Sequence, residues 1–212
     1  MPASKKPANN RPLIFGAALV VILAVVAFFA TRGEDAGGPA GEEPEQVRPV
    51  AVEGQPLAQL SASGQDPAVG QTAPSIRGTG FDGDAVNIEP GSQPRLVIFV
   101  AHWCPHCQRE VPKIVQWLED SGTPQGLDMI VVATATDPNR PNYPPSEWLE
   151  EEGLDLSTMA DDRNGTAAQA YGLSAYPYFV LMDANNRVIA RDSGELSTEE
   201  LDELVELAGN DS

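Results

Sequence analysis

Cysteine and histidine are scarce in this 212-residue chain, which has two of each. Two cysteines are too few for the disulfide framework of a small secreted fold. A bridge between Cys104 and Cys107 would also close a very short loop, which makes a poor structural staple. His102 and His106 lie in the same stretch, so residues 101–107 hold all of the thiol and imidazole chemistry of the protein.

Basic residues are also scarce: beyond residue 32, nine of them stand against 31 acidic residues. The whole chain has a formal net charge of −18 at pH 7. An acidic body without a Lys/Arg-rich patch is repelled by nucleic acid and by anionic lipid. We therefore expect no nucleic-acid partner.

Charge is absent altogether from residues 13–30, which form one apolar stretch. Its length suits a single membrane-spanning helix with little tilt. The basic residues within 1–12 predict a cytoplasmic N-terminus by the positive-inside rule. A cleaved signal peptide is the competing interpretation, but the stretch is long for one, and Phe28 stands where cleavage after Ala30 needs a small residue. We expect an uncleaved single-pass anchor in the cell membrane.

Apolar periodicity is missing from residues 31–68, which are rich in Gly, Pro, Ala, Glu, Gln and Ser. This composition predicts a disordered linker. The folded domain is then expected over 69–212, outside the cytoplasm.

Strands and helices alternate through the predicted domain. An Asp-Gly turn at residues 82–83 predicts a β-hairpin, and two apolar runs predict buried strands. The expected strands cover residues 75–77, 85–88, 96–100, 127–135, 159–160, 178–182 and 187–191, and the expected helices cover 108–118, 146–152, 166–171 and 197–208. The pattern indicates an α/β fold with a central mixed sheet flanked by helices and an N-terminal hairpin extension.

The two cysteines stand between a predicted buried strand and a predicted helix, which is typical of a dithiol redox site. At the start of the helix, Cys104 would be favoured as a thiolate by unpaired amides and by the helix dipole. It is the predicted nucleophile, and Cys107 would resolve the mixed disulfide. The alternative is metal binding by both thiols with His102 and His106, copper being favoured over zinc. Four ligands on one short junction converge poorly, so redox chemistry is the stronger hypothesis.

The order of elements resembles the thioredoxin fold. Within it, the pattern Trp103-Cys104-x-x-Cys107-x-x-Glu110-x-Pro112 is similar to the TlpA/ResA (redoxin) type of extracytoplasmic thiol–disulfide oxidoreductases. The resemblance implies an enzyme without a cofactor other than its redox-active cysteine pair. It also implies partners that are extracytoplasmic protein thiols and disulfides, and a further membrane or soluble protein that recycles the dithiol.

The same resemblance implies roles for Glu110 and Pro177. A glutamate at the position of Glu110 modulates the active-site thiols, and Pro177 matches a cis-proline that lies against the dithiol and offers neighbouring backbone to an extended substrate. Tyr176 is bulkier than the residue often found before that proline. We expect Trp103 to be an apolar shield over Cys104, and Pro112 to kink the helix.

His106 leaves the direction of electron flow open. A protonated imidazole between the cysteines stabilises the thiolate and makes the disulfide more oxidising, and the same Pro-His dipeptide occurs in DsbA-type oxidases. The family resemblance instead implies a reductase, for example of apocytochrome c during cytochrome c maturation or of copper-site thiols. Reduction and oxidation or isomerisation therefore both remain hypotheses.

Two other classes of function compete with disulfide exchange. The first is a copper metallochaperone that uses Cys104, Cys107 and a histidine. The second is a thiol peroxidase, which ranks lower because the residues before Cys104 lack the threonine that peroxide chemistry needs.

Overall fold

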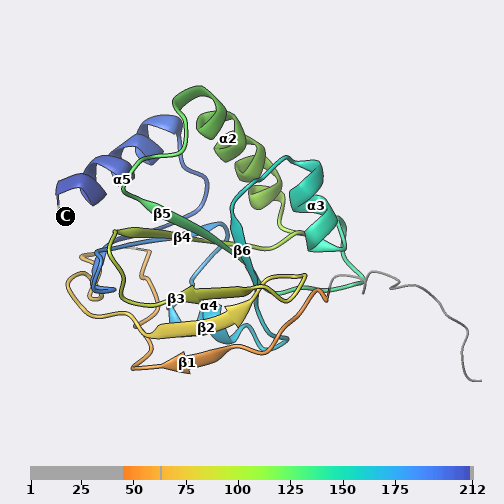
Figure 1. The fold of residues 1–212 in the computed structure, drawn as a ribbon, viewed down its shortest axis with the longest axis horizontal. Helices are drawn as coiled ribbons and strands as arrows, with labels where there is room; N and C mark the ends of the chain where they lie inside the picture. The colour runs from red at the N-terminus through yellow and green to blue at the C-terminus, as the bar shows by residue number, and fades with distance from the viewer. Residues whose placement is uncertain (1–44, 63, 211–212) are drawn as a thin grey trace, which may run out of the picture. The chain divides into compact units, whose positions relative to one another are not determined.

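The computed structural model describes residues 45–62 and 64–210 (Figure 1). The expected cytoplasmic N-terminus and membrane anchor over 1–30 lie outside this range. Within the described residues, no helix has both the length and the apolar character needed to cross a membrane.

A five-stranded mixed sheet forms the centre of the domain, in the order β6-β5-β4-β7-β8. Its strands are β4 (Arg95–Val100), β5 (Asp128–Ala133), β6 (Ser157–Ala160), β7 (Tyr178–Met182) and β8 (Val188–Ser193). β4 runs parallel to β5 and antiparallel to β7, and β6 is parallel to β5. The predicted mixed sheet and its terminal β7–β8 hairpin are confirmed.

Both faces of the sheet are covered, which explains why β4 is an uninterrupted apolar run rather than an alternating one. Leu96, Ile98 and Val100 point into a core shared with helices α2 (Pro105–Ser121) and α5 (Thr198–Asn210). Val97 and Phe99 point into a second core, shared with α4 and the small sheet β1–β3. Figure 1 shows these layers on opposite sides of the central strands. The helices are α2 (Pro105–Ser121), α3 (Pro145–Glu151), α4 (Thr166–Ala170) and α5 (Thr198–Asn210).

A second sheet of three antiparallel strands extends the domain on its N-terminal side. Its β2 (Ser75–Thr79) and β3 (Ala85–Ile88) are the predicted hairpin. The third strand, β1 (Ala51–Glu53), pairs with β2 and falls inside the expected linker. Its side chains are largely exposed, so pairing rests on the backbone, and hydrophobic periodicity could not reveal it.

The expectation of a disordered linker up to residue 68 is wrong for residues 45–62 and 64–68, which are part of the fold. Leu57 and Ala68 are buried. The N–H of Leu57 donates to the carbonyl of Ala170 (2.9 Å), and the N–H of Leu60 donates to that of Gly172 (3.0 Å). Gly172 has φ +69°, and a Cβ there would lie 2.3 Å from the carbonyl oxygen of Ala58. Only glycine fits this close approach.

Arg191 on β8 holds this segment in place. Its buried guanidinium forms two hydrogen bonds with the carboxylate of Asp66, one of them Nε to Oδ2 at 2.8 Å. It also donates to the carbonyls of Ala58 (2.9 Å) and Tyr171 (3.1 Å). The hydrogen bond from Arg191 lowers the pKa of Asp66 below its ordinary value.

We expect Asp66→Asn to lower the free energy of unfolding by about 2–4 kcal/mol at neutral pH, because it leaves the buried Arg191 charge unpaired. The pKa of Asp66 is depressed in the folded protein, so its contribution is fully present above the ordinary carboxyl pKa of about 4 and is lost as pH falls through the lower folded value. The difference between variant and wild type should therefore shrink on acidification below about pH 4. Urea unfolding at several pH values measures this.

Asp155→Asn is the matched control, since Asp155 is an exposed aspartate. An equal loss of stability in both variants would contradict a specific role for the Asp66–Arg191 pair.

Candidate active site

The two cysteines lie where β4 passes into α2. Cys104 is the N-cap residue of α2, with Pro105 opening the helix, and its side chain forms no capping hydrogen bond. Its backbone N–H donates to the carbonyl of Ala101 (2.9 Å). Both cysteines are free thiols. Cys104 is 7% exposed and Cys107 is fully buried, so Cys104 is the more accessible of two buried thiols.

Cys107 is held as a neutral thiol. Burial raises its pKa well above the ordinary range, and the neighbouring Cys104 and the Glu110 carboxylate add to the rise. The N–H of Ala101 donates to its Sγ (3.4 Å) and partly opposes that rise. Cys107 therefore suits the second step of an exchange, when a disulfide lies beside it.

Glu110 is fully buried one helical turn after Cys107. Its Oε2 accepts a hydrogen bond from Lys113 Nζ (2.8 Å), and its Oε1 accepts one from the N–H of Leu196 (3.1 Å). Burial raises its pKa, while Lys113 and Leu196 oppose the rise. A buried carboxyl group at this position can exchange a proton near the thiols. Lys113 is a partner that the sequence pattern did not reveal.

The peptide bond between Tyr176 and Pro177 is cis, as the resemblance predicts. Pro177 is buried and Tyr176 is partly exposed. The Tyr176 ring meets Trp103 edge to face, with 6.0 Å between centroids. Burial raises the pKa of Tyr176 to about 12, so it is a neutral phenol. Trp103 and Tyr176 thus form one aromatic layer beside the dithiol.

Trp103 is fixed from its other side by the loop after β5. Its Nε1 donates to the carbonyl of Ala135 (2.8 Å), and the guanidinium of Arg140 lies 4.4 Å from its ring centroid. This is a cation–π geometry. No sequence pattern pointed to Arg140, which stands in a polar, proline-rich loop.

His102 is buried, and it anchors the same loop. Its Nδ1 lies 2.6 Å from the carbonyl oxygen of Pro141, and its Nε2 accepts from the N–H of Asp137 (3.2 Å). These partners assign the proton to Nδ1. Burial lowers the pKa of His102, which is consistent with a neutral ring. Since backbone groups occupy both nitrogens, the proposal of His102 as a metal ligand does not fit the structure.

His106 is exposed and is paired with residues that the sequence did not bring near it. Its Nδ1 lies 2.7 Å from Glu195 Oε1 and 2.9 Å from Arg109 Nη2. Glu195 stands 89 positions further along the chain. Among residues 45–62 and 64–210, no three or more His, Cys, Asp or Glu side chains are grouped to hold a metal ion.

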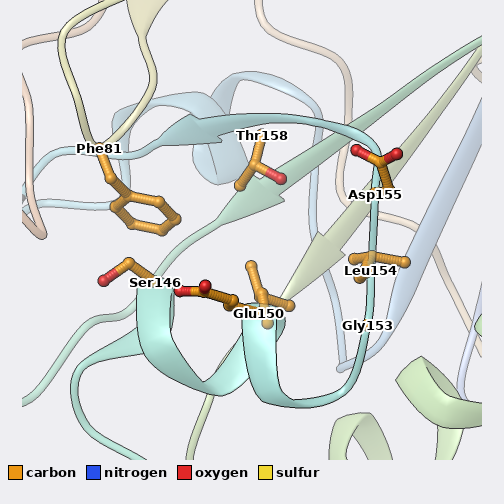
Figure 2. Close-up of a pocket in the computed structure, with 8 residues that line it drawn as sticks. Phe81, Ser146, Glu150, Gly153, Leu154, Asp155 and Thr158 are labelled. Carbon is orange, nitrogen blue, oxygen red and sulfur yellow. The ribbon is translucent and has the colours of Figure 1, made fainter.

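Several hollows lie beside the elements of the described part of the chain. One, of about 370 Å³, opens between α3, β6 and the turn of the β2–β3 hairpin, where the Phe81 ring points toward Thr158 and α3 (Figure 2). None of the predicted site residues lines it. Another, of about 280 Å³, is bounded by Tyr176, Thr134 and Arg163 and adjoins the cis-proline.

A Cys-Pro-His-Cys motif at a strand–helix junction, set in a thioredoxin-like sheet with a cis-proline, defines a thiol–disulfide oxidoreductase. The chain belongs to the redoxin family, whose model matches residues 68–207. The dithiol is the redox group of this class, and the enzyme works without a separate cofactor.

Curated relatives agree with this family. The chain is 27% identical over 137 residues to a thiol:disulfide interchange protein DsbE homolog of Paracoccus denitrificans, covering 62% of this chain and 70% of the relative. It is 23% identical over 138 residues to the thiol-disulfide oxidoreductase ResA of Bacillus thuringiensis, covering 65% and 76%.

A solved structure gives the same fold. A putative thiol:disulfide interchange protein DsbE from Chlorobium tepidum has a TM-score of 0.55 at 22% identity, over 66% of this chain and 96% of that one. The thioredoxin-like fold expected from the sequence is therefore confirmed.

We expect Cys104 to be alkylated at least about tenfold faster than Cys107 in the reduced, folded protein near pH 8, because thiolate is the reactive form. Cys107 has a raised pKa, so little of its thiolate forms, and its full burial keeps the reagent from its sulfur. Iodoacetamide labelling followed by peptide mass spectrometry measures the two rates. In urea the two rates should converge, and equal rates in the folded protein would contradict the assignment of roles.

Proposed function

We propose that this protein is a membrane-anchored enzyme that reduces disulfides of proteins outside the cytoplasm. The observation that carries the proposal is the pairing of an outward thiol at the start of α2 with a buried thiol one turn later. Residues 13–30 would anchor the domain, and the acidic body would keep it off anionic surfaces.

The proposed cycle uses only thiols. The Cys104 thiolate attacks one sulfur of a substrate disulfide, the substrate S–S bond breaks, and the other substrate sulfur leaves as a thiolate that takes up a proton. Cys107 then loses its proton and attacks Cys104 sulfur, which releases the second substrate thiol. Two electrons pass to the substrate and a Cys104–Cys107 disulfide remains. A separate thiol donor must reduce it again.

Glu110 is the group we propose to receive the Cys107 proton. Its carboxyl is buried within one turn of Cys107, and its raised pKa brings it closer to the pH at which it works. Tyr176 and Pro177 would offer backbone to an extended substrate, with Trp103 shielding Cys104 from water.

Reduction is the proposed direction because the structure does not stabilise the thiolate of Cys107. A strongly oxidising dithiol needs a stabilised reduced form, whereas here burial and the Glu110 charge oppose thiolate at one of the two sulfurs. Proteins that need paired cysteines kept reduced, such as an apocytochrome c or a copper site, are the proposed clients.

Trapping tests the exchange. With a disulfide-bonded protein such as insulin, reduced Cys107→Ser should accumulate a mixed disulfide through Cys104, because the resolving thiol is gone. Cys104→Ser should form none, and only the wild type should turn over with a thiol donor. Non-reducing electrophoresis and mass spectrometry identify the adduct. Equal trapping by both variants, or no adduct at all, would contradict the proposed cycle.

A further inference from the structure

The loop between β8 and α5 is bound to a single stripe of α2. The stripe consists of His106, Arg109, Glu110 and Lys113, whose spacing places them on one helix face. All four contact the consecutive residues Glu195 and Leu196. The stripe begins between the two cysteines and runs one further turn beyond Glu110.

Glu195 brings three donors to one oxygen. Its Oε1 lies 3.0 Å from Arg109 Nε, 2.6 Å from Arg109 Nη2 and 2.7 Å from His106 Nδ1. The pKa of Glu195 is lowered to about 2, with Arg109 as the largest cause and His106 next. The carboxylate is thus ionised at any pH at which the enzyme would work.

Leu196 fixes where that carboxylate stands. It is buried, its N–H donates to Glu110 Oε1 (3.1 Å), and its carbonyl accepts from Lys113 Nζ (2.6 Å). Both the N–H and the carbonyl of Leu196, next to Glu195, are therefore held by hydrogen bonds to α2. The side chain of Glu195 is only 29% exposed, whereas a freely moving surface glutamate would be far more open.

The contact with Glu195 also decides which form His106 takes. Nδ1 can donate to Glu195 only when it carries a proton, and it can accept from Arg109 only when it does not. The Glu195 contact is the shorter and its acceptor is a carboxylate, so it favours the tautomer with the proton on Nδ1. Any positive charge on the ring then faces a carboxylate rather than solvent.

The same cluster acts on the nucleophile. Arg109 stands near the start of α2, five residues after Cys104. Its hydrogen bond with Glu195 is the largest cause of its raised pKa, and the charge of Cys104 is a lesser one. A cation near Cys104 stabilises its thiolate and the reduced form of the dithiol, which makes the disulfide more oxidising. The carboxylate of Glu195 opposes this effect.

We propose that Glu195 is a positioning residue for the dithiol: its carboxylate holds His106 and Arg109 in place and cancels the positive charge of Arg109 at the start of α2. The inference rests on the proposed thiol–disulfide exchange and explains how a histidine between the cysteines is compatible with a reducing couple. Glu195 does not touch the reacting sulfurs; it acts through His106 and Arg109.

Glu195→Gln tests the inference, because it keeps the size and polarity of the side chain and removes its charge. The equilibrium between the dithiol and glutathione should shift toward reduced protein by about threefold to tenfold, or about 15–30 mV in potential at about 30 mV per tenfold. Arg109→Gln in the Glu195→Gln background should return the constant toward the wild-type value, since it removes the uncompensated cation.

Glu119→Gln is the control for net charge. Glu119 is exposed near the far end of α2, about 22 Å along the helix from Cys104, where screening makes its effect negligible. The inference is overturned if Glu195→Gln has the same equilibrium constant with glutathione as Glu119→Gln, or if it makes the couple more reducing. It is also overturned if adding Arg109→Gln does not return that constant toward the wild-type value.

The potential also separates this inference from the proposed function. If Cys104 and Cys107 form no reversible disulfide in the wild type, disulfide exchange itself fails. If they do, and Glu195→Gln leaves the constant at the wild-type value, only the role of Glu195 fails.

Discussion

Strand β4 is hydrogen-bonded along both edges, in parallel to β5 and antiparallel to β7, and this double pairing fixes where the chemistry takes place. Both faces of β4 are also covered by apolar cores, so packing as well as pairing holds its end in place. The chain leaves it at Ala101 and enters α2 at Pro105. Cys104 is thereby held at a helix start beside a rigid strand, and Cys107 is carried one turn into the core. The slight exposure of Cys104 and the complete burial of Cys107 follow from this geometry.

Electrostatics around the dithiol is a balance between groups on α2 and the loop that follows β8. Burial and the Glu110 carboxylate oppose thiolate at Cys107, whereas the Arg109 guanidinium presents positive charge near the start of α2. The loop takes part in both effects. The Glu195 carboxylate binds His106 and Arg109, and the Leu196 N–H binds the Glu110 carboxylate. A single dipeptide can therefore tune the redox couple without lying in the motif that defines the family.

The segment before the family domain shows how composition can mislead. Residues 45–62 and 64–68 have the Gly, Pro and polar content of a linker, and yet they supply β1 and two buried side chains. What orders them is the backbone pairing with β2 and the hydrogen bonds of Arg191 on a strand more than a hundred residues away. Neither interaction leaves a hydrophobic pattern, so a sequence argument based on periodicity had no signal to use.

The sequence by itself determined the features whose parts are adjacent in the chain. The buried strand, the Cys-Pro-His-Cys turn, the helix with Glu110 one turn on and the β7–β8 hairpin all follow from local spacing and apolar pattern, and the resemblance that they carry predicted the cis bond before Pro177. Only the tertiary structure decided which distant groups contact these residues. Glu195 binds His106, the carbonyl of Pro141 binds His102, and the guanidinium of Arg140 lies over the Trp103 ring. These contacts join exposed or loop residues far apart in the chain. Their geometry depends on how the sheet and helices bring the loops together, which no local pattern of residues encodes.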